Sequence, residues 1–151
     1  MGERLTDLEL EAWQALLHSH DQVTRRLDAE LRREHGLSLS EYDVLLRLAQ
    51  APELRLRMTR LARRVLFSPS GLTRAVDRLV GAGLIERQRD PADARVVVAR
   101  LTDHGRERLR SAAQTHVRGI RRHFTARLSE SQLREVASAL QVIAGPQEPH
   151  G

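Results

Sequence analysis

The sequence contains no cysteine, so disulfide frameworks, cysteine–zinc sites and thiol-based redox sensing are excluded. It has no apolar run that approaches the ~18 residues of a membrane-spanning helix, and its first residues lack the apolar core of a signal peptide. Aromatic residues make up only 3% of the chain, which argues against a stacking surface for single-stranded nucleic acid. We therefore expect a cytoplasmic protein that has no membrane partner.

Lysine is also absent, and all 25 basic side chains are arginines. A GC-rich genome explains this bias, although arginine also binds guanine and phosphate through paired hydrogen bonds. Residues 1–53 carry 6 arginines and 11 acids, residues 54–110 carry 14 and 6, and residues 111–151 carry 5 and 3. The basic middle indicates contact with a polyanion, but basic patches also occur on proteins that bind no nucleic acid.

Capping patterns mark where the helices begin. Thr6 and Glu9 form a capping box that opens a first helix of about 28 residues, and Gly36 ends this helix. Its apolar stripe consists of Trp13, Leu16, Leu17, Val23, Leu27 and Leu31.

Three shorter helices are expected next. Ser40, with Asp43 three residues later, is expected to open the second helix, and Thr59 to cap a short third one. Ser68 followed by Pro69 is a strong start for the fourth helix, which should run to about residue 82. The apolar faces of the second and fourth helices comprise Val44, Leu45, Leu48, Ala49, Leu72, Val76 and Leu79.

The periodicity then changes from helical to extended. Residues 84–89 and 95–101 are predicted to be two strands. The second contains a run of three valines, which favours extended structure. The turn-rich residues 90–94 between them predict a hairpin. Thr102 caps a fifth helix, and Ser129 opens a sixth helix that ends near residue 145.

This order predicts a mainly α-helical protein with a small β-hairpin wing, a winged helix-turn-helix. The elements are helix, helix, short strand, helix, helix, two strands, helix and helix. We assign residues 38–102 to a DNA-binding lobe, residues 1–37 and 103–145 to a helical dimerisation region, and residues 146–151 to a frayed tail.

The fourth helix is the expected recognition helix, since the second helix of such a unit enters the major groove. Short side chains near its start allow close approach to phosphates, and its arginines reach base edges or phosphates. A merely solvated face is the alternative. The expected DNA-contacting residues of this segment are Ser68, Ser70, Gly71, Thr73, Arg74 and Arg78, with Asp77 on the same face.

The wing carries a motif of a known family. Asp93-Ala94-Arg95 is followed, after five residues, by Leu101-Thr102. This D-x-R-x5-L-T pattern resembles the wing signature of the multiple-antibiotic-resistance regulator (MarR) family of bacterial winged-helix repressors. The segments Ser68–Arg74, Asp77–Leu79 and Gly83–Ile85 are also similar to this family, and the resemblance covers roughly residues 5–145.

The resemblance implies that Arg95 enters the minor groove of DNA and that Asp93 organises it. A narrow minor groove concentrates negative potential, which attracts arginine. The alternative is an Asp–Arg turn with no role in DNA binding. On the preceding strand we expect Arg87 and Arg89 to contact phosphates, although plain solvent exposure explains them nearly as well.

A homodimer is expected, because one recognition helix covers only a short half-site. The operator would be an inverted repeat with half-sites about 10 bp apart. Family resemblance implies that the first, fifth and sixth helices intertwine; packing of their apolar stripes within one chain is the alternative. The expected interface residues are Leu8, Val117, Ile120, Phe124, Val136, Leu140 and Ile143.

The resemblance also implies a small, often aromatic, anionic effector that releases the protein from DNA. Trp13, His18, His20 and Tyr42 could line its pocket, but ordinary core or interface packing explains these side chains better. No pair of histidines has the i, i+4 spacing of a helical metal site, so we expect neither a metal nor another cofactor.

Nothing in the sequence predicts an enzyme. A phosphate loop, a nucleophile elbow and a zinc-protease motif are all missing. The resemblance makes repression the default role of this regulator. The remaining alternative is an architectural protein that binds DNA without reading its sequence.

Overall fold

The computed structural model describes residues 2–65 and 69–146. It confirms the predicted order of elements and adds two short 3-10 turns. The elements are α1 (Asp7–His35), α2 (Leu39–Ala49), η1 (Pro52–Leu54), β1 (Arg55–Arg57), α3 (Met58–Arg64), α4 (Pro69–Gly81), β2 (Ile85–Arg89), β3 (Val97–Leu101), α5 (Asp103–His123), η2 (Thr125–Arg127) and α6 (Glu130–Ala144).

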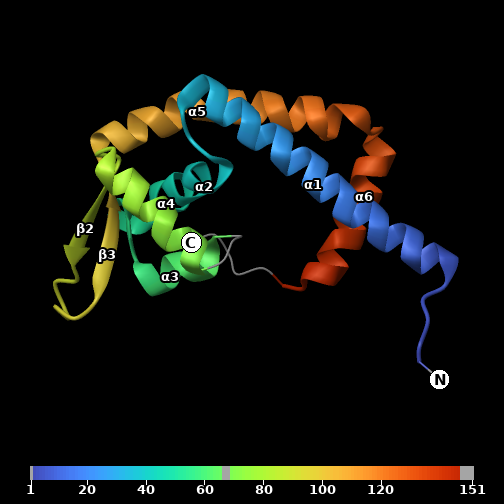
Figure 1. The fold of residues 1–151 in the computed structure, drawn as a ribbon, viewed down its shortest axis with the longest axis horizontal. Coiled ribbons are helices and arrows are strands. Elements are labelled where there is room, and N and C mark those ends of the chain that lie inside the picture. Colours follow the sequence, from blue (N-terminus) through green and yellow to red (C-terminus); the bar gives the residue numbers. More distant parts are fainter. Residues whose placement is uncertain (1, 66–68, 147–151) are drawn as a thin grey trace.

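The two longest helices, α1 and α5, lie side by side along one edge of the molecule (Figure 1). Their approach is close at Gly119, where a Cβ atom would lie 2.6 Å from the Leu27 side chain. Helices α2, α3 and α4 and the strands gather below one end of this pair, and α6 follows at the other end (Figure 1). No described helix is long and apolar enough to cross a membrane.

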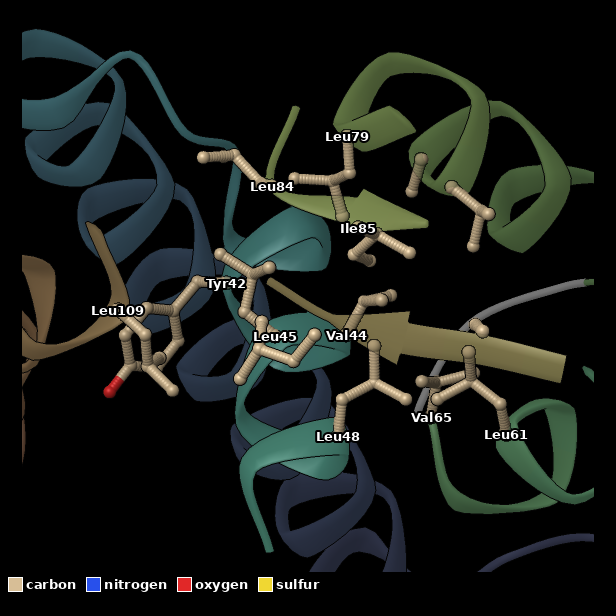
Figure 2. Close-up of a cluster of buried hydrophobic side chains, with 14 of the residues drawn as sticks. Tyr42, Val44, Leu45, Leu48, Leu61, Val65, Leu79, Leu84, Ile85 and Leu109 are labelled. Carbon is tan, nitrogen blue, oxygen red and sulfur yellow. The ribbon is translucent and has the colours of Figure 1, made fainter. Parts of the chain in front are cut away.

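One hydrophobic core joins this lobe to the long helices (Figure 2). The predicted inner faces of α2 and α4 are confirmed, except that Ala49 is only partly buried. Leu31 of α1 and Leu109 of α5 complete the core. Burying apolar side chains of this size contributes about 1.5–3 kcal/mol each, so the core is the main source of stability in the lobe.

The strands form a three-stranded antiparallel sheet in the order β1-β3-β2. Ile85 pairs with Leu101 and Arg89 with Val97 in the hairpin, while Leu56 pairs with Ala99 on the other edge of β3. Leu56, Ile85 and Ala99 are buried. The short strand β1 thus fixes the start of α3 against the hairpin.

Two predicted helix starts are wrong by two residues each. Helix α2 is capped by Ser38, whose hydroxyl accepts from the Glu41 N–H at 3.0 Å while the Glu41 carboxylate accepts from the Ser38 N–H at 2.9 Å. Ser40 is not the cap. Glu41 is long enough to reach back to the Ser38 N–H, whereas Asp43, three residues after Ser40, bonds to Arg47 instead.

Helix α3 begins at Met58, before the predicted cap Thr59. The preceding residue, Arg57, makes no side-chain capping bond. Strand β1 pairs with β3 and ends at Arg57, directly before α3. The sheet therefore sets the start of α3 without a side-chain cap. By contrast, the predicted caps Thr6, Thr102 and Ser129 are confirmed.

A junction joins the end of α4, the base of the hairpin and the start of α5. The Thr102 N–H donates to the Leu84 carbonyl at 3.1 Å, and the Thr102 hydroxyl donates to the Gly83 carbonyl at 2.8 Å. A Cβ atom on Gly105 would lie 2.2 Å from the Leu84 carbonyl oxygen. Only glycine allows α5 to begin this close to the turn that follows α4.

Candidate nucleic-acid interface

Helix α4 presents an apolar face to the core and a polar face to solvent. The buried residues are Leu72, Ala75, Val76 and Leu79, which have the spacing of one helix face. Most of the predicted DNA-contacting residues lie opposite: Ser70, Thr73, Arg74 and Arg78 are exposed, and Gly71 is half-buried. Ser68 lies outside the described residues. Arg74 forms no ion pair within the described residues, so its guanidinium group is available to a ligand.

Arg78, unlike Arg74, forms an ion pair within the protein. Its Nε atom donates to the carboxylate of Glu41, the residue that completes the cap of α2. The Glu41 side chain is only 8% exposed, while that of Arg78 is 58% exposed. The bond therefore fixes the stem of Arg78 and leaves its outer end in solvent.

A second ion pair joins the recognition helix to the wing. Arg87 of β2 donates from Nη2 to the Asp77 carboxylate of α4. Arg89 donates from Nη1 to the Ala94 carbonyl at 2.7 Å. These two arginines, predicted to contact phosphates, thus have partners within the chain: the Arg87 pair holds the wing against α4, and the Arg89 bond closes the wing turn.

The wing turn is organised by two aspartates. Asp93 accepts from the Arg95 N–H at 3.0 Å and from the Arg95 Nε atom at 3.1 Å. Asp90 accepts from the Ala92 N–H at 2.8 Å and from the Arg57 Nε atom at 2.7 Å. The Arg95 side chain remains 91% exposed, so Asp93 orients it without covering it.

These bonds keep both wing carboxylates charged. The hydrogen bond from the Arg95 side chain, followed by that from its N–H, lowers the pKa of Asp93. The Ala92 N–H, with a smaller contribution from Arg57, lowers the pKa of Asp90. Each folded pKa lies below the unfolded value, so the turn keeps its bonds at neutral pH and loses them only as the pH falls through the folded pKa.

The four residues proposed for an effector pocket lie in different environments. Trp13, His18 and His20 are exposed on α1. Tyr42 is buried, and its ring centroid lies 4.5 Å from that of His116. Packing in the core therefore accounts for Tyr42 alone. Within the described residues, no cluster of three or more metal-binding side chains is present.

The residues expected at a dimer interface are poorly covered within one chain. Leu8 is 75% exposed and Ile143 is 73% exposed; Val117, Phe124 and Leu140 are exposed, and Ile120 and Val136 are half-buried. Further exposed apolar residues, not included in the expected interface, are Leu5, Leu10, Trp13, Leu16, Leu17 and Val142. Helix α6 has no buried residue at all.

Sequence reasoning missed Glu41 and Asp90 as supports of the interface. Both carboxylates bond to arginines, at separations of 37 and 33 residues along the chain. A one-dimensional pattern carries no signal for the Glu41–Arg78 pair. The capping sequence Ser38-x-x-Glu41 was the one local sign that Glu41 is fixed.

Comparisons with known proteins agree with this geometry. The chain matches the MarR family over residues 35–96. It is 30% identical over 97 residues to the HTH-type transcriptional regulator YdgJ of Bacillus subtilis (strain 168), a match that covers 64% of this chain and 58% of that protein. The chain thus spans less than two thirds of this relative's length.

Two solved structures are similar over nearly the whole chain. Sco3205, a MarR family transcriptional regulator from Streptomyces coelicolor in complex with DNA, has a TM-score of 0.88 and 33% identity, covering 95% of this chain and 90% of that one. AbsC, a MarR family transcriptional regulator from the same organism, has a TM-score of 0.86 and 35% identity, covering 95% and 96%. Together with the wing signature and the recognition helix, these similarities establish that the chain belongs to the MarR family of transcriptional regulators.

Proposed function

We propose that this protein is a transcription regulator that binds a specific sequence of double-stranded DNA and is not an enzyme. The observation that carries the proposal is the pair of exposed arginines on neighbouring elements, Arg74 on α4 and Arg95 on the wing. Arg74 suits the major groove, where arginine binds guanine through two hydrogen bonds. Arg95 suits the narrow minor groove beside it. The similarity to Sco3205, which was solved in complex with DNA, supports DNA binding by this fold.

The active form is proposed to be a homodimer. Apart from Val97 on β3, the exposed large apolar residues lie on or next to α1, α5 and α6, outside the lobe that carries α4 and the wing. A monomer rarely leaves so large an apolar surface in water, and a second copy would cover it. We therefore keep the division into a DNA-binding lobe, residues 38–102, and a dimerisation region, residues 1–37 and 103–145.

Two-fold symmetry would place two recognition helices on an inverted repeat, with half-sites about 10 bp apart. Repression in the cytoplasm, with release by a small effector, remains the expected mode of action. Sedimentation at micromolar concentration should give about twice the 17.1 kDa chain mass. A stable monomer would contradict the dimer.

The test of DNA reading is selection of bound sequences from random duplexes at two salt concentrations. An inverted repeat recovered at both concentrations is the expected result. The Arg95→Ala variant, in parallel, should lose preference in the flanking minor groove while Arg121→Ala, an exposed arginine on α5, should not. Binding without any consensus, lost steeply as salt rises, would favour architectural binding instead.

A further inference from the structure

A basic cleft lies beside the wing turn and shares only Arg57 and Asp90 with the site described above. Its cavity has a volume of about 530 Å³, within the rough 300–1,000 Å³ range of clefts that hold ligands. It lies between β1, α3 and the wing turn. Its charged lining residues are Arg55, Arg57, Arg60, Arg63 and Asp90.

Among the described lining residues, the one carboxylate, that of Asp90, is already bonded. Asp90 accepts from Arg57 and from the Ala92 N–H, and Arg55 is paired with Glu53. Arg60 and Arg63, three residues apart on α3, are exposed and form no ion pair within the described part of the chain. The cleft therefore has an excess of positive charge and two guanidinium groups without a counter-ion.

We propose that this cleft is a phosphate-binding site that takes the backbone of DNA beside the wing. Guanidinium groups bind phosphate oxygens through charge-assisted, often paired, hydrogen bonds. Arg60 and Arg63 are the binding residues. Arg57 is a positioning residue, since its bond to Asp90 joins the cleft to the wing turn.

Two features favour a DNA backbone over a free anion. The wall formed by Asp90 and Pro91 lies in the same turn as Asp93 and Arg95, so a duplex that receives Arg95 passes close to the cleft. Arg60 and Arg63 are exposed, which suits a polymer lying across an open surface. This inference rests on the proposed function, and it extends the contact surface beyond α4 and the wing tip.

The test compares the double variant Arg60→Gln/Arg63→Gln with a charge-matched control, Arg26→Gln/Arg121→Gln, which changes two exposed arginines of the long helices. Affinity is measured at several salt concentrations on the selected operator and on an operator extended by roughly one helical turn at each end. Thermal melts check that both variants fold.

The expected result is a shallower salt dependence for the cleft variant alone, by about 0.9 in the logarithmic slope for each phosphate that the protein no longer neutralises. In the proposed homodimer both subunits carry the change, so if each lost arginine leaves one phosphate unneutralised, the fall in affinity between 50 and 200 mM salt would be roughly 100-fold smaller. Salt slopes equal to those of the control on both duplexes would overturn the assignment to DNA.

Titration with inorganic pyrophosphate tests whether the cleft binds a free anion instead of the DNA backbone. If it binds the wild type but not the cleft variant while DNA binding is unchanged, the cleft takes a free anion. If the cleft variant changes neither the salt dependence of DNA binding nor the binding of pyrophosphate, the phosphate site is overturned altogether. A wild type that binds no operator would contradict the proposed function, yet the pyrophosphate titration would still report on the cleft.

Discussion

Arg78 on the recognition helix is bonded to Glu41, the residue that caps α2. One carboxylate oxygen of Glu41 accepts from the Arg78 Nε atom, and the other accepts from the Ser38 N–H. The start of α2 and the position of α4 are therefore set by the same buried group. Any change that moves the α1–α2 corner therefore acts directly on α4, the helix proposed to contact DNA.

The Glu41→Gln variant tests this bond. Glutamine keeps the size of the side chain but removes the charge, so the charge-assisted hydrogen bond is weakened. We expect the free energy of unfolding to fall by about 1–3 kcal/mol. Urea denaturation measures it, and the Arg78→Gln variant combined with Glu41→Gln should cost less than the sum of the two. Additive losses would contradict the pairing.

The Arg95→Ala variant should weaken operator binding by about 1–3 kcal/mol, the value of a good base contact. Asp93→Asn should weaken binding less, since it removes only the group that orients Arg95. Titration of a labelled operator measures both changes, with Arg121→Ala as the matched control. Unchanged affinity in Arg95→Ala would contradict the minor-groove role.

The Arg74→Ala variant should relax base preference at one position of each half-site. The loss should be about 1–3 kcal/mol at that position, because the guanidinium group would no longer pair with a guanine. Affinities for operators changed one base pair at a time measure it. A uniform loss across all of these operators would instead assign Arg74 to a phosphate.

Gly105→Ala should destabilise the fold despite the higher helix propensity of alanine. The added Cβ would meet the Leu84 carbonyl oxygen at 2.2 Å and the Leu101 side chain at 2.7 Å. Overpacking of this kind costs about 1–3 kcal/mol. Gly81→Ala is the matched control, since nothing lies within 4 Å of its Cβ position, and it should stabilise by up to about 1 kcal/mol. Thermal melts compare the two.

His116→Phe should remove part of the acid sensitivity of the fold. Burial against Tyr42 lowers the pKa of His116, while Asp43 opposes this shift. The unfolded chain therefore takes up the proton first as the pH falls below about 6.5, and the free energy of unfolding falls with it. Above that pH the folded state has its full stability.

Urea denaturation between pH 8 and pH 5 measures this effect as the difference between wild type and His116→Phe, which keeps an aromatic ring beside Tyr42. The two stability profiles should run parallel above about pH 6.5 and diverge below it. Parallel profiles across the whole range would show that His116 does not titrate differently on folding.

Local signals predicted most of the fold, because a helix cap depends on residues three positions apart. Thr6, Thr102 and Ser129 were found in this way. The same rule failed at Ser40, where a second serine two residues earlier had the better partner in Glu41. The start of α3 could not be predicted locally, since pairing between β1 and β3 sets it.

The candidate site was predictable in its residues but less so in their partners. The outward face of α4 follows from helical periodicity. The bonds of Arg78 and Arg87 join segments that only the folded chain brings together. The first-helix stripe shows a different limit, because Leu27 and Leu31 are buried in one chain while Trp13 and Leu16 are exposed. Periodicity identifies an apolar face but not which molecule covers it.

The junction at Thr102 has a mechanical consequence. Thr102 bonds to the Gly83 and Leu84 carbonyls and also caps α5. The base of the hairpin is therefore fixed in position relative to that helix. Helix α5 is therefore attached to the wing at its N-terminal end. In the proposed homodimer, we expect a small tilt of α5 to move the wing as a unit, which changes the distance between the two wings rather than the shape of either one.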